Sequence, residues 1–165
     1  MNLRAMERIT DSLAETPRLP VLFLGHGNPM HAILDNPSTR NLAALGAGLR
    51  TLNPAAVLVV SAHWLTRGTR VSMTASPETI HDFGGFPDEL FQVQYPAPGA
   101  PRQAQVAREL LSGVGATGDE ERGLDHGAWT VHRHLVPEAN LPVFQVSNDY
   151  DAPPEHHFRL AADLK

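Results

Sequence analysis

Two histidines follow short apolar runs and are the residues of this sequence best suited to metal chemistry. His26 lies between two glycines just after the apolar run 21–24, and His63 comes shortly after the apolar run 57–60. An unbroken apolar run is typical of a strand buried on both faces, and ligands of open parallel sheets bind just beyond the carboxyl ends of the strands. We therefore expect both imidazoles at one rim of a sheet, where they could bind a divalent metal ion.

The composition narrows the choice of ligands and partners. The chain has no cysteine, which leaves its nine histidines and its carboxylates as the strong metal ligands. The formal net charge is −5 and no block of basic residues occurs, so nucleic acid is not an expected partner. The first twenty residues lack the apolar core of a signal peptide, and no apolar run approaches transmembrane length. We expect no membrane partner and a cytoplasmic location.

The elements that must position these histidines alternate along the chain. Apolar and β-branched runs predict strands over residues 21–24, 57–61, 69–73 and 141–147, and helical spacing predicts helices over 38–52, 101–111, 130–136 and 154–164. A length of 165 residues suits one domain. The alternation predicts an α/β fold, a three-layer αβα arrangement around a mostly parallel sheet. Because no strand follows the last helix, the last part of that sheet is expected to be missing from the chain.

Residues 75–101 are rich in proline, glycine and aromatic residues, and they predict a long loop of the kind that borders a binding site. The loop carries His81, and a second histidine beside a glycine, His126, stands at a predicted helix entrance. Simpler interpretations stay open: His26 as a turn residue, His63 packed under Trp64, His81 bonded to Asp82, and Asp125 beside His126 as a helix cap only. The other histidines are predicted to be solvated surface residues; they are His31, His132, His134, His156 and His157.

Five ordered motifs together carry a family resemblance. They are LFLGHGNPM around His26, VVSAHW around His63, TIHDFGGFP around His81, YPAPG from Tyr95, and LDHGAW around His126. In this order they resemble the class III extradiol ring-cleavage dioxygenases, and in particular the DOPA 4,5-dioxygenase branch. The resemblance covers roughly residues 19–165.

The resemblance implies a non-haem Fe(II) enzyme that opens a small catechol with O2 to a muconic semialdehyde, with Zn(II) able to occupy the site instead. His26 and His63 match the family's two early metal-ligand positions. His126 matches a second-sphere catalytic histidine that orients or protonates bound dioxygen or substrate. His81 and Asp82 match a segment that borders the substrate pocket.

The family is also longer than this chain, and its further part supplies another ligand and a second catalytic histidine. We therefore expect residues 1–18 to be a flexible arm and residues 19–165 to be the N-terminal portion of a longer dioxygenase domain. Two alternatives accompany this interpretation. One is a non-catalytic metal-binding remnant, or half of a domain that another chain completes, and the other is a zinc hydrolase based on histidine ligation alone.

Overall fold

The computed structural model describes residues 19–164, so the predicted N-terminal arm, residues 1–18, lies outside the described residues. The elements, in chain order, are η1 (Pro29–Ala32), α2 (Pro37–Arg50), β1 (Val57–Val59), β2 (Leu65–Thr66), β3 (Arg70–Ser72), α3 (Asp88–Phe91), α4 (Pro101–Leu110), η2 (Leu111–Val114), β4 (Thr117–Asp119), α5 (His126–Leu135), β5 (Val143–Gln145), β6 (Asn148–Asp149) and α6 (Pro154–Asp163).

Parallel strand pairs form the centre of the molecule, as the α/β prediction requires. β1 pairs with β5, β2 with β6 and β3 with β4, each in parallel. In the central pair, Val57 lies opposite Val143 and Leu58 opposite Phe144. The predicted strands at 57–61, 69–73 and 141–147 are present but shorter, and they belong to separate two-stranded sheets rather than to one continuous sheet.

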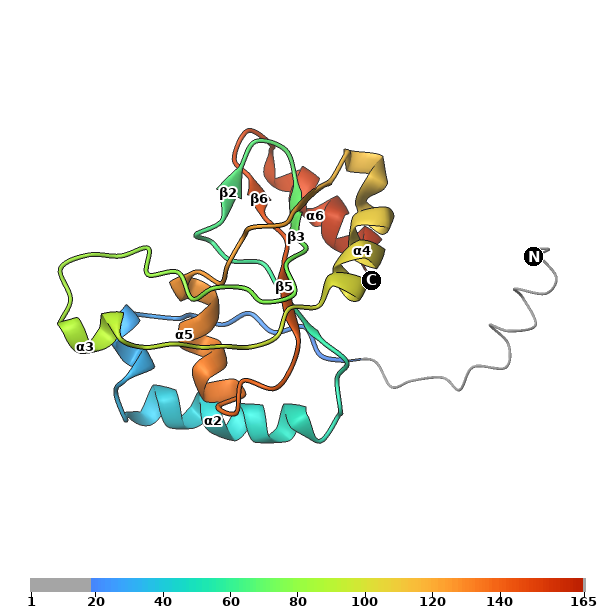
Figure 1. The fold of residues 1–165 in the computed structure, drawn as a ribbon. Coiled ribbons are helices and arrows are strands. Elements are labelled where there is room, and N and C mark those ends of the chain that lie inside the picture. Colours follow the sequence, from blue (N-terminus) through green and yellow to red (C-terminus); the bar gives the residue numbers. More distant parts are fainter. Residues whose placement is uncertain (1–18, 165) are drawn as a thin grey trace.

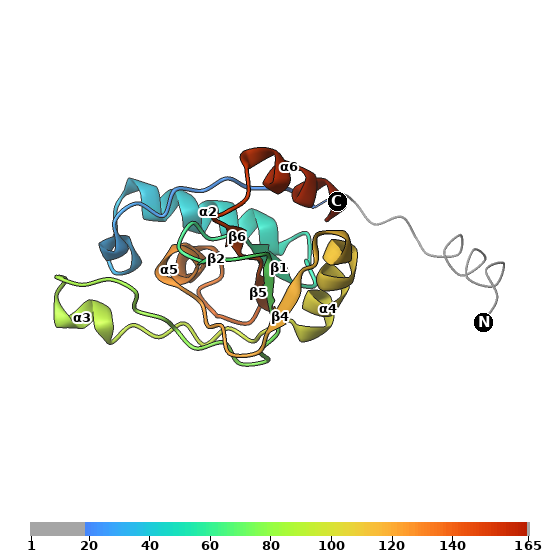
Figure 2. The same cartoon turned by 90° about the horizontal axis from the view of Figure 1, so that it is seen from above.

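Alternating side chains of the central pair create the layers. On one face, the valines of β1 and β5 pack against Trp129 of α5. On the other face, Phe144 shares a buried cluster with Ala104 and Ala107 of α4 and with Leu160 of α6. Figures 1 and 2 show α5 and α4 on opposite sides of β5. Successive residues of a strand point to opposite faces, so a short apolar run is sufficient to bury both faces.

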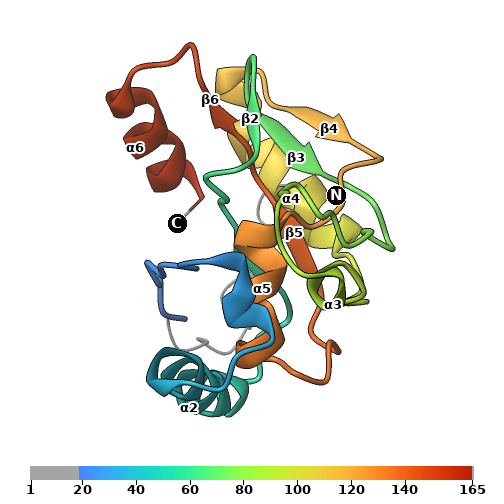
Figure 3. The ribbon, with the colours of Figure 1, turned by 90° about the vertical axis from the view of Figure 1, so that its left-hand side faces the viewer.

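Helix α2 packs outside α5, on the side away from β5 (Figure 3). Leucines of α2 pack against Leu135 of α5. Gly46 permits this close approach, because a Cβ at that position would collide with the Leu135 backbone. Asn36 caps the start of the helix by accepting hydrogen bonds from the backbone of Ser38 and Thr39. The helix predicted over 38–52 is therefore confirmed as α2.

The long loop predicted between the third strand and the next helix is confirmed, with the single turn of α3 inside it. Figure 1 shows it projecting from the body of the molecule, with α3 near its outer end. Its two ends are held together, because Gly99 donates its backbone N–H to the carbonyl of Ala75 at 2.9 Å. The loop brings His81 and Asp82 back toward the body of the protein.

One predicted strand and the start of one predicted helix are wrong. Residues 21–24 are not a strand: the segment pairs with no strand of residues 19–164, and its outward side chains, Val21 and Phe23, are 99% and 103% exposed. The helix predicted over 130–136 begins four residues earlier, at His126, because the Asp125 side chain caps it by accepting from Ala128 N. His126 is therefore the first residue of a helix.

The prediction that five histidines are solvated is also wrong. His132 is 6% exposed and lies edge-on to Tyr95, and its burial lowers the pKa to about 4. His132 lies one turn after the buried residues Ala128 and Trp129, on the face of α5 that packs against the core. The remaining four are half-buried, and His134, for example, donates from Nε2 to the carbonyl of His31 at 2.7 Å. Among residues 19–164, no helix is long and apolar enough to cross a bilayer.

Candidate metal centre

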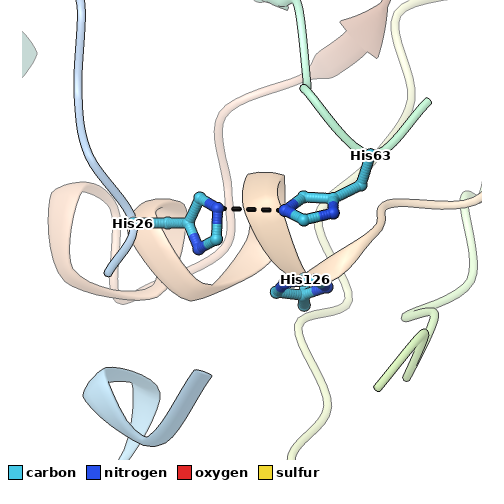
Figure 4. Close-up of side chains that lie close together, drawn as sticks. All are labelled: His26, His63 and His126. Atoms are coloured by element: carbon cyan, nitrogen blue, oxygen red, sulfur yellow. Dashed lines mark hydrogen bonds between the residues drawn. The ribbon is translucent and has the colours of Figure 1, made fainter. Parts of the chain in front are cut away.

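Three histidines from distant parts of the sequence meet at one point of the fold. His26 comes from the extended segment before η1, His63 from the loop after β1, and His126 from the first turn of α5 (Figure 4). The Nε2 atoms of His26 and His63 are 3.0 Å apart. One possible ligand atom of each histidine lies within 4.8 Å of the corresponding atoms of the other two.

The carboxyl end of β1 explains the position of His63. β1 ends at Val59 in the central pair, and the chain then leaves the sheet at the rim where His63 lies. Asn148 fixes this exit, because its side-chain amide donates to the Ser61 carbonyl at 2.8 Å. The expectation that His26 and His63 converge at the end of a parallel strand is thus consistent with the structure, although His26 reaches the point from an irregular segment.

Asp82 orients His126. Its Oδ1 accepts two hydrogen bonds from that residue, one from the backbone N at 3.0 Å and one from ring Nδ1 at 2.8 Å. Because a carboxylate only accepts, Nδ1 carries the proton and Nε2 of the neutral ring keeps a free lone pair. Burial opposes ionisation of Asp82, but the hydrogen bonds from His126 outweigh it and lower the pKa of the carboxyl. Asp82 is therefore a carboxylate at neutral pH.

His26 is predisposed to the neutral form that binds metals. Burial, reinforced by the nearby rings of His63 and His126, lowers its pKa below the ordinary value. Its Nδ1 is buried and has no hydrogen-bond partner among residues 19–164. A metal ion competes with a proton for imidazole nitrogen, so at neutral pH a lowered pKa leaves the ring in the unprotonated form that a metal can bind.

The donor set fits a divalent metal ion such as Zn(II) or Fe(II). Two imidazole nitrogens bound to one tetrahedral zinc at about 2.0–2.1 Å are about 3.3 Å apart. The 3.0 Å between the Nε2 atoms of His26 and His63 is close to this separation. Imidazole nitrogens suit both zinc and iron.

His81 does not join the three histidines. Its Nε2 donates to the Val93 carbonyl at 3.0 Å, and its ring is surrounded by the aromatic rings of Phe83, Phe91 and Trp129. The alternative in which His81 bonds its neighbour Asp82 is wrong. The hydrogen bonds of Asp82 Oδ1 go to His126 instead. His81 therefore lies beside the three histidines, within a group of aromatic rings that we call the aromatic wall: Phe83, Phe91 and Trp129.

Sequence reasoning missed the residues that hold His63 in place. Ser61 Oγ accepts from His63 N at 3.2 Å and donates to Asp125 Oδ1 at 2.5 Å. Asp125, for which a role as a helix cap only was one open interpretation, is fully buried and also binds Arg122 Nη2 at 2.7 Å. The signal was present in the short motifs that carry these residues, but the partners are 64 positions apart and only the fold pairs them.

Comparisons with known proteins agree with this arrangement. Residues 13–164 match the family described as the catalytic LigB subunit of aromatic ring-opening dioxygenase, and the chain belongs to this family. A 4,5-DOPA dioxygenase extradiol of Escherichia coli K12 is 46% identical over 157 residues, which is 94% of this chain and 57% of that protein. A protein of the same name from Beta vulgaris is 40% identical over 158 residues, covering 93% of this chain and 57% of its own length.

A solved structure shows the same fold. The crystal structure of an uncharacterized protein from Escherichia coli K12 matches with a TM-score of 0.64 and 40% identity, over 79% of this chain and 48% of that one. The chain thus spans about half the length of the relatives that it matches.

Proposed function

We propose that this chain carries the metal centre of an extradiol dioxygenase, which opens the ring of a small catechol with O2 to give a muconic semialdehyde. The observation that supports the proposal most directly is the convergence of His26, His63 and His126, with two Nε2 atoms 3.0 Å apart. Membership of the aromatic ring-opening family favours this reaction over the alternative of a zinc hydrolase, which rests on histidine ligation alone.

In this proposal His26 and His63 hold Fe(II), with Zn(II) able to bind in its place. The metal would bring catechol and dioxygen together and let electron density pass from the ring to O2. Both atoms of O2 end in the product, so the reaction needs no external reductant. The two imidazoles contribute no charge, so the positive charge of the metal would favour binding of a deprotonated catechol.

His126 is proposed as the catalytic acid and base. Asp82 fixes the proton on Nδ1, so Nε2 is free to accept a proton from a catechol hydroxyl and to return it to an oxygen of the product. The ring of His126 lies 4.0 Å from that of His63, centroid to centroid, so a substrate bound beside His63 would lie within its reach. Asp82 would stabilise the protonated ring while it holds the proton.

The aromatic wall is proposed to face the substrate ring. Phe83 stands edge-on to His126 with ring centroids 5.6 Å apart, and it packs in turn against His81. We propose that His81 and Asp82 border the substrate pocket, with His81 acting through its ring because Val93 occupies its Nε2. Because the two relatives are named 4,5-DOPA dioxygenase extradiol, DOPA is the first catechol to test.

The test is oxygen uptake by the purified chain with DOPA and added Fe(II). The proposal predicts one O2 consumed per catechol, with growth of the yellow absorbance of the semialdehyde. His63→Ala should abolish both signals, whereas His156→Ala, a half-buried histidine of α6, should keep them. Metal binding without oxygen uptake would contradict the catalytic proposal and favour the metal-binding remnant, and zinc-dependent ester cleavage would favour the hydrolase.

A further inference from the structure

We propose that the hydrogen bond between Ser61 and Asp125, together with the absence of a side chain at Gly127, is a positioning device that sets His63 against His126 before any metal binds. The inference rests on the metal centre of the proposed function. It concerns residues beside the three histidines that the family resemblance gave no role in the chemistry.

Ser61 links His63 to the start of α5. Its hydroxyl accepts from the backbone N of His63 at 3.2 Å and donates to Asp125 Oδ1 at 2.5 Å. One hydroxyl therefore uses both its donor and its acceptor capacity in holding a metal-ligand segment to the helix that carries His126.

Asp125 is a rigid anchor for this bond. Its carboxylate is fully buried, and the same Oδ1 also accepts from Ala128 N at 3.2 Å, which caps α5. Its Oδ2 accepts from Arg122 at 2.7 Å, and the Arg122 guanidinium lies over the Trp64 ring at 5.1 Å. Since Ser61 and Trp64 flank His63 in the chain, the anchor holds the loop on both sides of the ligand.

Gly127 lets the imidazole lie against the first turn of the helix. A Cβ at this position would come within 2.7 Å of His63 Cδ2 and 2.8 Å of Ser61 Oγ. No side chain fits unless both His63 and Ser61 move. The requirement here is space rather than backbone conformation, because the backbone of Gly127 is ordinary α-helix.

These contacts hold His63 in its metal-binding position before a metal binds. His63 is an exposed loop residue, and without a restraint its ring would lose conformational freedom each time a metal binds. Hydrogen-bonded partners of metal ligands are worth about 10–100-fold in metal affinity. The structure places this restraint in Ser61, Asp125 and Gly127 rather than in a direct bond to the His63 ring.

The experiment compares Ser61→Ala and Gly127→Ala with Ser72→Ala in the whole chain. Ser72 is a matched control, because it is also a buried serine whose hydroxyl accepts a backbone N–H, that of Gln145, at 2.7 Å, but it lies in β3. Zn(II) affinity is measured by competition with a chromophoric chelator. The metal-free proteins are compared by the NMR cross-peak between His63 Hδ2 and the Gly127 Hα atoms.

Ser61→Ala and Gly127→Ala should weaken Zn(II) binding by about 10–100-fold and should lose the cross-peak, while thermal unfolding still shows a folded protein. Ser72→Ala should change the affinity less than about twofold and keep the cross-peak. Unchanged affinity together with an unchanged cross-peak in Ser61→Ala would overturn the proposal. If the unaltered protein binds no Zn(II), the proposed metal centre fails, and the cross-peak alone then decides whether Ser61 positions His63.

Discussion

Asp82 binds His126 twice through a single oxygen, at 3.0 Å from the backbone N and at 2.8 Å from ring Nδ1. The two residues are 44 positions apart, on the long loop and on α5. The pair fixes both the place of the helix start and the tautomer of the histidine. A loop that looks irregular in the sequence thereby orients the proposed acid and base.

Replacing Asp82 with alanine should therefore change the chemistry of His126 more than the stability of the protein. The proton on Nδ1 loses its acceptor, so the neutral ring is released to exchange tautomers. We expect turnover to fall by about 10–100-fold, as for other residues that orient a functional group. The tautomer is measured by 15N shifts of the His126 ring, and shifts identical to those of the unaltered protein would contradict this account.

Metal should stabilise the folded chain through His26. Binding of Zn(II) at about 100 times its dissociation constant adds about 2.7 kcal/mol to the free energy of unfolding. Thermal unfolding with and without Zn(II) should show this gain in the unaltered protein and in His156→Ala, and a chelator should remove it. His26→Ala should show little of the gain, and an equal gain in that variant would place the metal elsewhere.

The Arg122–Asp125 pair should matter far more than an exposed ion pair. Asp125 is fully buried and the Arg122 side chain is 18% exposed, so Asp125→Ala leaves a largely buried cation without its partner. We expect a loss of about 3–5 kcal/mol in the free energy of unfolding, measured by urea denaturation. Asp35→Ala is the matched control, since it breaks an exposed pair with Arg40 and should cost at most about 1 kcal/mol. Similar losses in the two variants would contradict the anchor role.

His132 should make the protein less stable as the pH falls below neutrality. Burial lowers its pKa to about 4 from an ordinary 6.5, so between these values the unfolded chain binds a proton that the folded chain does not. The free energy of unfolding therefore keeps its full value above pH 6.5. It falls toward pH 4, by roughly 3 kcal/mol at most. In His132→Leu the decline over this range should be smaller. An unchanged pH profile in that variant would show that other groups cause the decline.

The sequence was informative where local rules decide. The apolar runs at 57–60 and 141–147 predicted the two strands that form the central parallel pair, and the position beyond a strand predicted His63 as a ligand candidate. The strand prediction failed at residues 21–24, because an apolar run becomes a strand only when a neighbouring strand supplies hydrogen-bond partners. Nothing in the run itself reports whether such a neighbour exists.

The contacts that refine the candidate site could not have been predicted. Asp82 with His126 and Ser61 with Asp125 are pairs separated by 44 and 64 residues, and short motifs carry no information on which partners the fold brings together. The helix cap was visible at Asp125, but its use as an anchor for the His63 loop depends on tertiary packing. The burial of His132 follows from the face that it shares with Ala128 and Trp129, two residues that the predicted helix over 130–136 left out.

The most direct test of the central claim is a crystal structure of the protein grown with Zn(II) or, without oxygen, with Fe(II), with anomalous diffraction recorded at the metal edge. We predict one strong anomalous peak about 2.0–2.2 Å from the Nε2 atoms of both His26 and His63, with Asp82 still bound to His126 Nδ1. No peak between these two imidazoles, or a peak only at other histidines such as His156 and His157, would contradict it.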